Sequence, residues 1–85
     1  MVDFDQELDV SGLKCPLPIL RTKKTLSGLL VGQVLRIICT DPGSVKDFSA
    51  FCKQTGHELL ESEEKQGTFY FLIKKTENLG GWHGK

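Results

Sequence analysis

The spacing of hydrophobic and polar residues along this 85-residue chain changes several times, and each spacing predicts a different element. Acids at every second position between residues 4 and 10, with apolar residues among the positions between them, are typical of a strand with one face buried. Between residues 16 and 27 the apolar positions recur every three or four residues, which predicts a helix. Pro16 fits a first helical turn because its missing N–H would have no intrahelical partner, and Gly28 is the expected terminator.

The middle of the chain predicts a central strand followed by a second helix. Residues 34–40 (VLRIICT) are mostly β-branched and apolar, as in a strand with at least one covered face. Ser44, with Asp47 three residues later, resembles a helix capping arrangement, and Gly56 is suited to end the helix. The predicted apolar face of this helix consists of Val45, Phe48, Cys52 and Thr55.

Two further strands are predicted at residues 59–63 and 68–75, separated by a turn at residues 65–67. The resulting order, βαβαββ, predicts an α/β (α+β) two-layer sandwich in which both helices cover one face of a four-stranded mixed sheet. We expect a single domain over residues 1–76 and a disordered tail over residues 77–85, which are glycine-rich and aperiodic. A chain this short buries little surface, so a deep enclosed active site is not expected.

Eleven acids balance eleven bases, so the net charge by itself gives no support for a nucleic-acid partner. No segment has the roughly 18 consecutive apolar residues of a membrane helix, and the acidic amino terminus differs from a signal peptide. We therefore expect a cytoplasmic protein with no membrane association. One region is locally basic, because no acid occurs between Asp9 and Asp41. The bases at its start are Lys14, Arg21, Lys23 and Lys24.

The three cysteines, Cys15, Cys39 and Cys52, are an odd number at spacings that fit neither a disulfide framework nor a zinc site. Cys39 lies in the predicted central strand and Cys52 on an apolar helix face, so both are expected to be buried. His57 follows a predicted helix end and is interpreted as a capping or surface residue rather than a catalytic base. No metal and no organic cofactor is predicted.

Cys15 differs from the other two because it lies where the first strand leads into the first helix, within residues 12–18 (GLKCPLP). Unpaired N–H groups and the helix dipole at a helix start favour the nucleophilic thiolate, and Lys14 adds positive charge. Pro16 and Pro18 lack an N–H, which leaves the amides of Leu17 and Ile19 as candidates to stabilise the sulfur.

The CPLP motif at residues 15–18 resembles the CPxP signature of the TusA family of sulfur carriers, also called SirA-like. Leu8-Asp9, Gly12-Leu13 and Asp41-Pro42 are similar to the flanking pattern of that family, and the resemblance covers residues 4–75. It implies a sulfurtransferase whose Cys15 accepts sulfane sulfur as a persulfide from a desulfurase or a rhodanese-like donor. An acceptor protein with a thiol would then take that sulfur, in tRNA thiolation, cofactor sulfur supply or sulfur oxidation.

Leu17 occupies the variable position of the motif, where some members of the tRNA pathway carry Glu, and this leaves the pathway open. A sulfur handed between two proteins requires a partner that surrounds the cysteine, so docking is expected around Cys15. Leu17 would be its apolar contact, and Lys14, Arg21, Lys23 and Lys24 would supply charge steering. Gly12 and the helix start at Pro16, Leu17, Pro18 and Ile19 would support the sulfur. We expect a monomer.

Two alternatives stay open from the residues alone. Small α/β sandwiches of this order also occur in RNA-binding proteins, so a nucleic-acid or regulatory module using the basic helix is one; zero net charge counts against direct nucleic-acid binding. A thiol redox protein is the other, and it would need a resolving cysteine close to Cys15.

Overall fold

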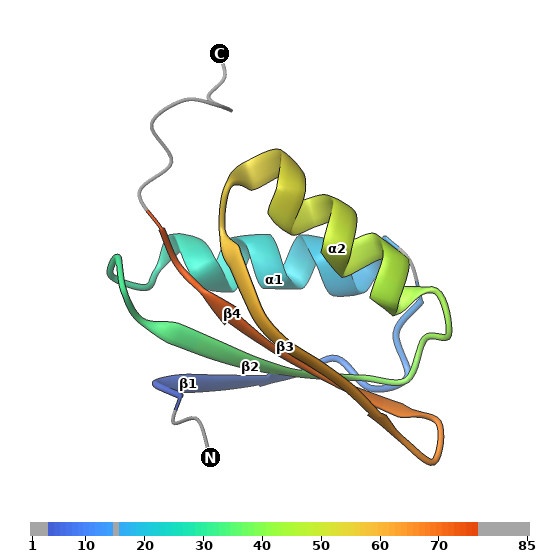
Figure 1. Cartoon of the computed structure of the whole chain (residues 1–85). Coiled ribbons are helices and arrows are strands. Elements are labelled where there is room, and N and C mark those ends of the chain that lie inside the picture. The colour runs from blue at the N-terminus through green and yellow to red at the C-terminus, as the bar shows by residue number, and fades with distance from the viewer. Residues whose placement is uncertain (1–3, 15, 77–85) are drawn as a thin grey trace.

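The computed structural model describes residues 4–14 and 16–76, and they form one layer of helices against one sheet (Figure 1). The elements are β1 (Gln6–Asp9), α1 (Leu17–Ser27), β2 (Val34–Cys39), α2 (Ser44–Thr55), β3 (Glu58–Lys65) and β4 (Thr68–Lys74). The predicted βαβαββ order is confirmed. The first strand is shorter than predicted, and β3 extends the predicted strand by one residue at its start and two at its end.

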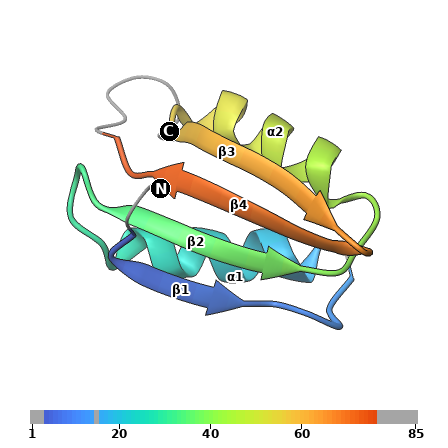
Figure 2. The same ribbon diagram turned by 60° about the horizontal axis from the view of Figure 1, so that its bottom comes forward.

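The sheet has the strand order β1-β2-β4-β3, with β1 parallel to β2 and the other two pairs antiparallel. Figure 2 shows the open face of this sheet, with both helices behind it: α1 behind β1 and β2, and α2 behind β3. The predicted fold class, a two-layer sandwich with a mixed sheet, is therefore confirmed. The sheet places β1 and β3 at its edges, so the strand that leads to Cys15 is paired on one side only.

The core lies between the helices and the two central strands, because every second side chain of a strand points to the same face. Leu35 and Ile37 of β2 are fully buried, as are Phe71 and Ile73 of β4. Phe48 of α2 stacks on Phe71 with ring centroids 4.6 Å apart. An aromatic pair of this kind contributes about 0.5–1.5 kcal/mol beyond its burial, which anchors α2 to the middle of the sheet.

The predicted faces of the two helices need correction. Val45 was expected on the apolar face of α2, but its exposed fraction is 45%. Leu20, one of the regularly spaced apolar residues between positions 16 and 27, is 54% exposed. The buried stripe of α1 is instead Pro18, Thr22 and Leu26, a strict spacing of four residues that includes a threonine. On α2, Ser44 and Phe51 are buried in addition to the predicted Phe48, Cys52 and Thr55.

The predicted cap of α2 at Ser44 is wrong. The N-cap is Gly43, whose carbonyl oxygen accepts a hydrogen bond from the Asp47 amide (3.1 Å), and no side chain caps the helix. Ser44 is the first residue of α2 and is buried, and its hydroxyl has no hydrogen-bond partner in the described part of the chain. Gly56 ends α2 in the left-handed conformation (φ 86°), as predicted.

α1 and α2 begin at the same end of the molecule, where β1 and β2 also finish (Figure 1). This arrangement follows from the parallel pairing of β1 and β2, which requires the chain to cross back through α1. Among the described residues, no helix is long and apolar enough to span a membrane. The tail predicted to be disordered, residues 77–85, lies outside the described residues.

Candidate functional site at the amino end of α1

The loop that joins β1 to α1 is held by short-range hydrogen bonds and by long-range bonds to the end of β2. Asp9 accepts a hydrogen bond from the Ser11 amide (2.9 Å), and the bonds from Ser11 lower the pKa of the Asp9 carboxyl. Gly12 adopts a left-handed conformation (φ 84°) that residues with a side chain rarely take. Its amide donates to the Thr40 hydroxyl (2.8 Å), which ties the loop to the end of β2.

Cys15 itself lies outside the described residues, but its neighbours on both sides are described. Pro16 is the N-cap of α1, and its carbonyl accepts the first helical hydrogen bond, from the Leu20 amide (3.0 Å). Pro18 is buried, so the second proline of the motif holds the first turn of α1 against the rest of the fold. The motif thus begins the helix immediately after the cysteine.

One of the two amides expected to support the sulfur has another partner. The Leu17 amide donates to the Lys14 carbonyl (2.9 Å). This bond competes with the expected support of the sulfur by the same amide, and that support remains a prediction. Ile19 is partly buried against the core, and the role of its amide remains a prediction.

A groove of about 490 Å³ runs along the outer side of α1, between the helix and the edge strand β1. It is lined by Leu8, Leu17, Leu20, Arg21, Lys24 and Thr25. The exposed fractions of Leu17 and Leu20 are 45% and 54%, which is high because leucine side chains are usually buried. This groove, called the α1 groove below, thus combines exposed apolar surface with two cationic groups next to the residues that follow Cys15.

The bases predicted to form one docking surface lie on two sides of α1. Arg21 and Lys24 line the α1 groove, and Lys14 is exposed in the turn before the helix. Lys23 lines a separate pocket at the other end of the helix. The division follows from the helical repeat, because positions 17, 21 and 24 share a face whereas position 23 is turned about 100° from position 24.

The other two cysteines are poorly placed for sulfur chemistry. Cys39 is fully buried in β2, and Cys52 is 6% exposed in α2. Burial raises the pKa of the Cys52 thiol to about 11, so it is protonated at neutral pH. The predicted burial of both is confirmed. No group of three or more potential metal-binding side chains occurs within residues 4–14 and 16–76.

Sequence reasoning missed the contributions of Leu8, Leu20 and Thr40. Leu20 was counted only among the apolar positions of the predicted helix, although its spacing from Leu17 and Lys24 was visible in the sequence. Leu8 and Thr40 reach the site through strand pairing and through a hydrogen bond across 28 residues, for which the sequence carries no local signal.

Comparisons with known proteins give one consistent result. Residues 6–75 match the model of the family described as sulfurtransferase TusA. The chain is 71% identical over 76 residues to a sulfur carrier protein TusA of Allochromatium vinosum, which covers 89% of this chain and all of the relative. It is 42% identical over 77 residues to a sulfur carrier protein TusA of Pseudomonas putida, covering 88% and 96% of the two chains. A SirA-like protein of Desulfitobacterium hafniense has a similar crystal structure, with a TM-score of 0.75 and 27% identity, covering 86% of this chain and all of that one.

Proposed function

The chain belongs to the TusA family of sulfur carriers, and from this premise we propose that it holds its sulfur as a persulfide on Cys15. The observation that carries the proposal is the CPLP motif, which lies within the matched residues and leads directly into α1. The burial of Cys39 and Cys52 supports it, because neither of those thiols offers a partner direct access to its sulfur. The chain would act in the cytoplasm as a sulfurtransferase with no cofactor.

Two transfers make up the proposed reaction. The Cys15 thiolate attacks the outer sulfur of a persulfide on the donor protein, the sulfur–sulfur bond of the donor breaks, and the donor cysteine leaves as a thiolate. The terminal sulfur of the Cys15 persulfide is then attacked by a thiolate of the acceptor protein, and Cys15 is released as a thiolate. Each step exchanges one sulfur–sulfur bond for another, so no external oxidant or reductant is consumed.

We propose that both partners dock over the α1 groove. Direct sulfur-to-sulfur transfer requires the partner to contact the surface next to Cys15, and Leu17 and Leu20 are the exposed apolar side chains there. Lys14, Arg21 and Lys24 would steer an acidic partner surface toward the groove. Lys23 would contribute only to the long-range electrostatic attraction of the partner, because it lines the pocket at the other end of α1.

The test is sulfur loading followed by intact mass measurement. The purified chain is incubated with a persulfurated desulfurase or rhodanese, and the same is done with Cys15→Ser and with Cys52→Ala as the matched control. We expect one added sulfur in the wild type and in Cys52→Ala and none in Cys15→Ser. Loading of Cys15→Ser at the wild-type level would refute the assignment.

A further inference from the structure

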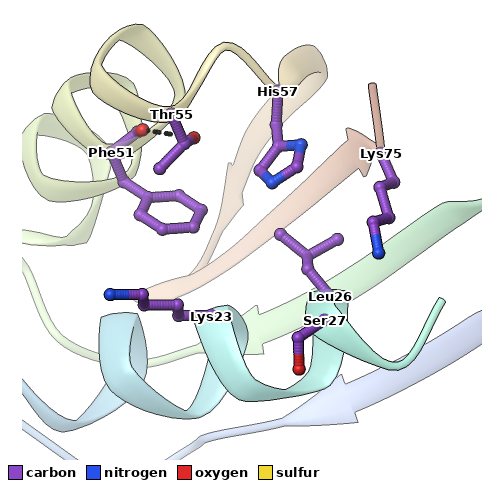
Figure 3. A pocket seen from close by; sticks show the side chains of 7 residues that line it. All are labelled: Lys23, Leu26, Ser27, Phe51, Thr55, His57 and Lys75. Atoms are coloured by element: carbon purple, nitrogen blue, oxygen red, sulfur yellow. Dashed lines mark hydrogen bonds between the residues drawn. The ribbon is translucent and has the colours of Figure 1, made fainter. Parts of the chain in front are cut away.

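A second concave site lies at the carboxyl end of α1, away from the residues around Cys15. It is a pocket of about 160 Å³ between the last turns of α1 and α2, next to the end of β4. Figure 3 shows the side chains that line it, which come from both helices, from the residue before β3 and from the residue after β4. They are Lys23, Leu26, Ser27, Phe51, Thr55, His57 and Lys75. The proposed sulfur transfer uses none of them directly.

The floor of this pocket is apolar. Leu26 is 1% exposed and Phe51 is 7% exposed, and the Phe51 ring lies 6.1 Å from the His57 ring, centroid to centroid. Thr55 donates its hydroxyl hydrogen to the Phe51 carbonyl (2.7 Å), so this donor is already used within α2. The inner part of the pocket therefore favours an apolar group over a polar one.

Hydrogen-bond donors and positive charge lie around the floor. The Lys75 ammonium donates to the Leu29 carbonyl (2.6 Å) at the end of α1, and this leaves two of its three hydrogens. His57 accepts a hydrogen bond at Nδ1 from the Thr76 amide (3.2 Å), which puts the proton of a neutral ring on Nε2, the nitrogen that faces the pocket in Figure 3. Lys23 adds a second ammonium on the opposite side.

The pKa of His57 agrees with this arrangement. Burial and the charge of Lys75 both lower it, so the ring is mostly neutral at neutral pH. The cationic groups that line the pocket at this pH are thus the two lysines, and no acid of residues 4–14 and 16–76 lines it. Such a site attracts an anion, while its floor attracts an apolar body.

We propose that this pocket binds a small organic carboxylate with a compact apolar body. The ring or chain of the ligand would lie on Leu26 and Phe51, and its carboxylate would accept hydrogen bonds from Lys75 and His57 Nε2–H, while Lys23 adds positive charge from the opposite side. The volume agrees with this class, since an apolar cavity of about 150 Å³ holds a benzene ring. Inorganic anions lack the apolar body, and neutral aromatic compounds lack the charge.

The experiment uses benzoate as the probe, with benzamide as its neutral analogue and acetate as the anion without a ring. Each compound is titrated into the full-length chain, and the amide and side-chain NMR shifts of Leu26, Phe51, Thr55 and His57 are followed. We expect saturable shifts at these residues with benzoate. Benzamide and acetate should bind at least about fivefold more weakly, because benzamide lacks the charged hydrogen bond and acetate lacks the ring that is buried.

Three substitutions test the cationic groups. Lys75→Met should weaken benzoate binding about tenfold, because it removes a hydrogen bond from a charged donor. Lys23→Met should weaken benzoate binding only about threefold, because the charge of this exposed side chain is screened by water. Lys53→Met makes the same charge change in the last turn of α2 but lies outside the pocket, so it should leave binding unchanged.

Lys75 also holds the end of α1, so the melting temperature of Lys75→Met is measured in parallel. The exposed Lys23 provides the variant that leaves the core intact. The proposal is overturned if benzoate produces no saturable shift at the pocket residues, or if benzamide binds as tightly as benzoate. It is also overturned if Lys23→Met and Lys53→Met weaken binding equally, since the effect would then be net charge alone.

Discussion

The two ends of α1 carry two different kinds of site. At the amino end, the α1 groove and the turn before the helix come mostly from residues 8–25, a continuous stretch that contains the cysteine motif. At the carboxyl end, the pocket takes side chains from four segments between residues 23 and 75. The first site has exposed leucines beside two bases, whereas the second has a buried apolar floor and a half-buried histidine beside two lysines.

This difference matches the two tasks that we propose. A sulfur that passes between proteins must be reachable by another sulfur, so an open surface next to the helix start is suitable. A small ligand needs enclosure, because most of its affinity comes from surface removed from water. The adjacent residues Lys23 and Lys24, which line different sites, provide a direct way to separate the two.

The largest expected effect concerns the reactivity of the three thiols. With a pKa of about 11, Cys52 should react with iodoacetamide at pH 8 about a hundredfold more slowly than a model thiol, and burial should slow Cys39 as well. Cys15 should react at lower pH than the model thiol. Peptide mapping after timed alkylation measures all three rates in one sample. Equal rates at Cys15 and Cys52 in the folded chain would contradict the distinction between the sites.

The next largest effect is on the rate of sulfur transfer when a charge is reversed on one side of α1 or the other. Lys24→Glu should slow sulfur transfer to an acceptor about tenfold at low salt, because this side chain borders the α1 groove, and the effect should shrink as salt rises. Lys23→Glu makes the same charge change one residue earlier and should have a clearly smaller effect. Transfer rates at low and high salt measure both. If the two variants are slowed equally, docking depends on net charge rather than on the groove.

A smaller effect concerns the backbone at the two ends of α1. Gly12→Ala should lower the free energy of unfolding by about 1 kcal/mol, since an alanine in the left-handed region is strained even though no atom lies within 4 Å of its new Cβ. Gly28, with φ of −91°, accepts any residue, so Gly28→Ala should leave stability unchanged or raise it slightly. Thermal unfolding measures the stability of both variants. A larger loss of stability in Gly28→Ala than in Gly12→Ala would show that the left-handed conformation of Gly12 does not constrain the β1–α1 loop.

The smallest effect concerns His57. Lys75→Met should raise its pKa toward, but not up to, the ordinary value of 6.5, because burial is the larger cause of the lowering and remains. The fold favours the neutral His57 ring, so below pH 6.5 the unfolded chain binds a proton more readily than the folded chain. The free energy of unfolding therefore falls as the pH drops below 6.5. The wild type should therefore lose stability on acidification more steeply than His57→Gln. NMR titration of the ring and melting temperatures against pH measure both expectations, and an unchanged His57 pKa in Lys75→Met would rule out the effect of the Lys75 charge on the ring.

The sequence predicted the features that depend on local pattern. The order of elements, the glycine ends of both helices and the burial of Cys39 and Cys52 all follow from periodicity and residue type. The faces of α1 and α2 were less predictable. Thr22 and Ser44 are buried although they are polar, and Leu20 is exposed although it is apolar, because neighbouring elements decide which side of a short helix is covered.

The pocket at the carboxyl end was not predictable for a different reason. His57 and Lys75 are separated by 18 residues in the sequence and meet only because β4 pairs with β3 and ends beside the start of that strand. His57 was interpreted as a capping or surface residue, but it is half-buried and accepts a hydrogen bond from Thr76. Such contacts depend on strand register, for which a single sequence gives no direct signal.

The most direct measurement of the central claim is to locate the sulfur on the loaded wild-type chain. The chain is persulfurated by a donor protein, alkylated with iodoacetamide without reduction, digested, and analysed by mass spectrometry peptide by peptide. The account predicts that the peptide containing Cys15 carries one additional sulfur under the alkyl group, and that the peptides containing Cys39 and Cys52 carry none. An additional sulfur on Cys39 or Cys52, with Cys15 unmodified, would contradict it.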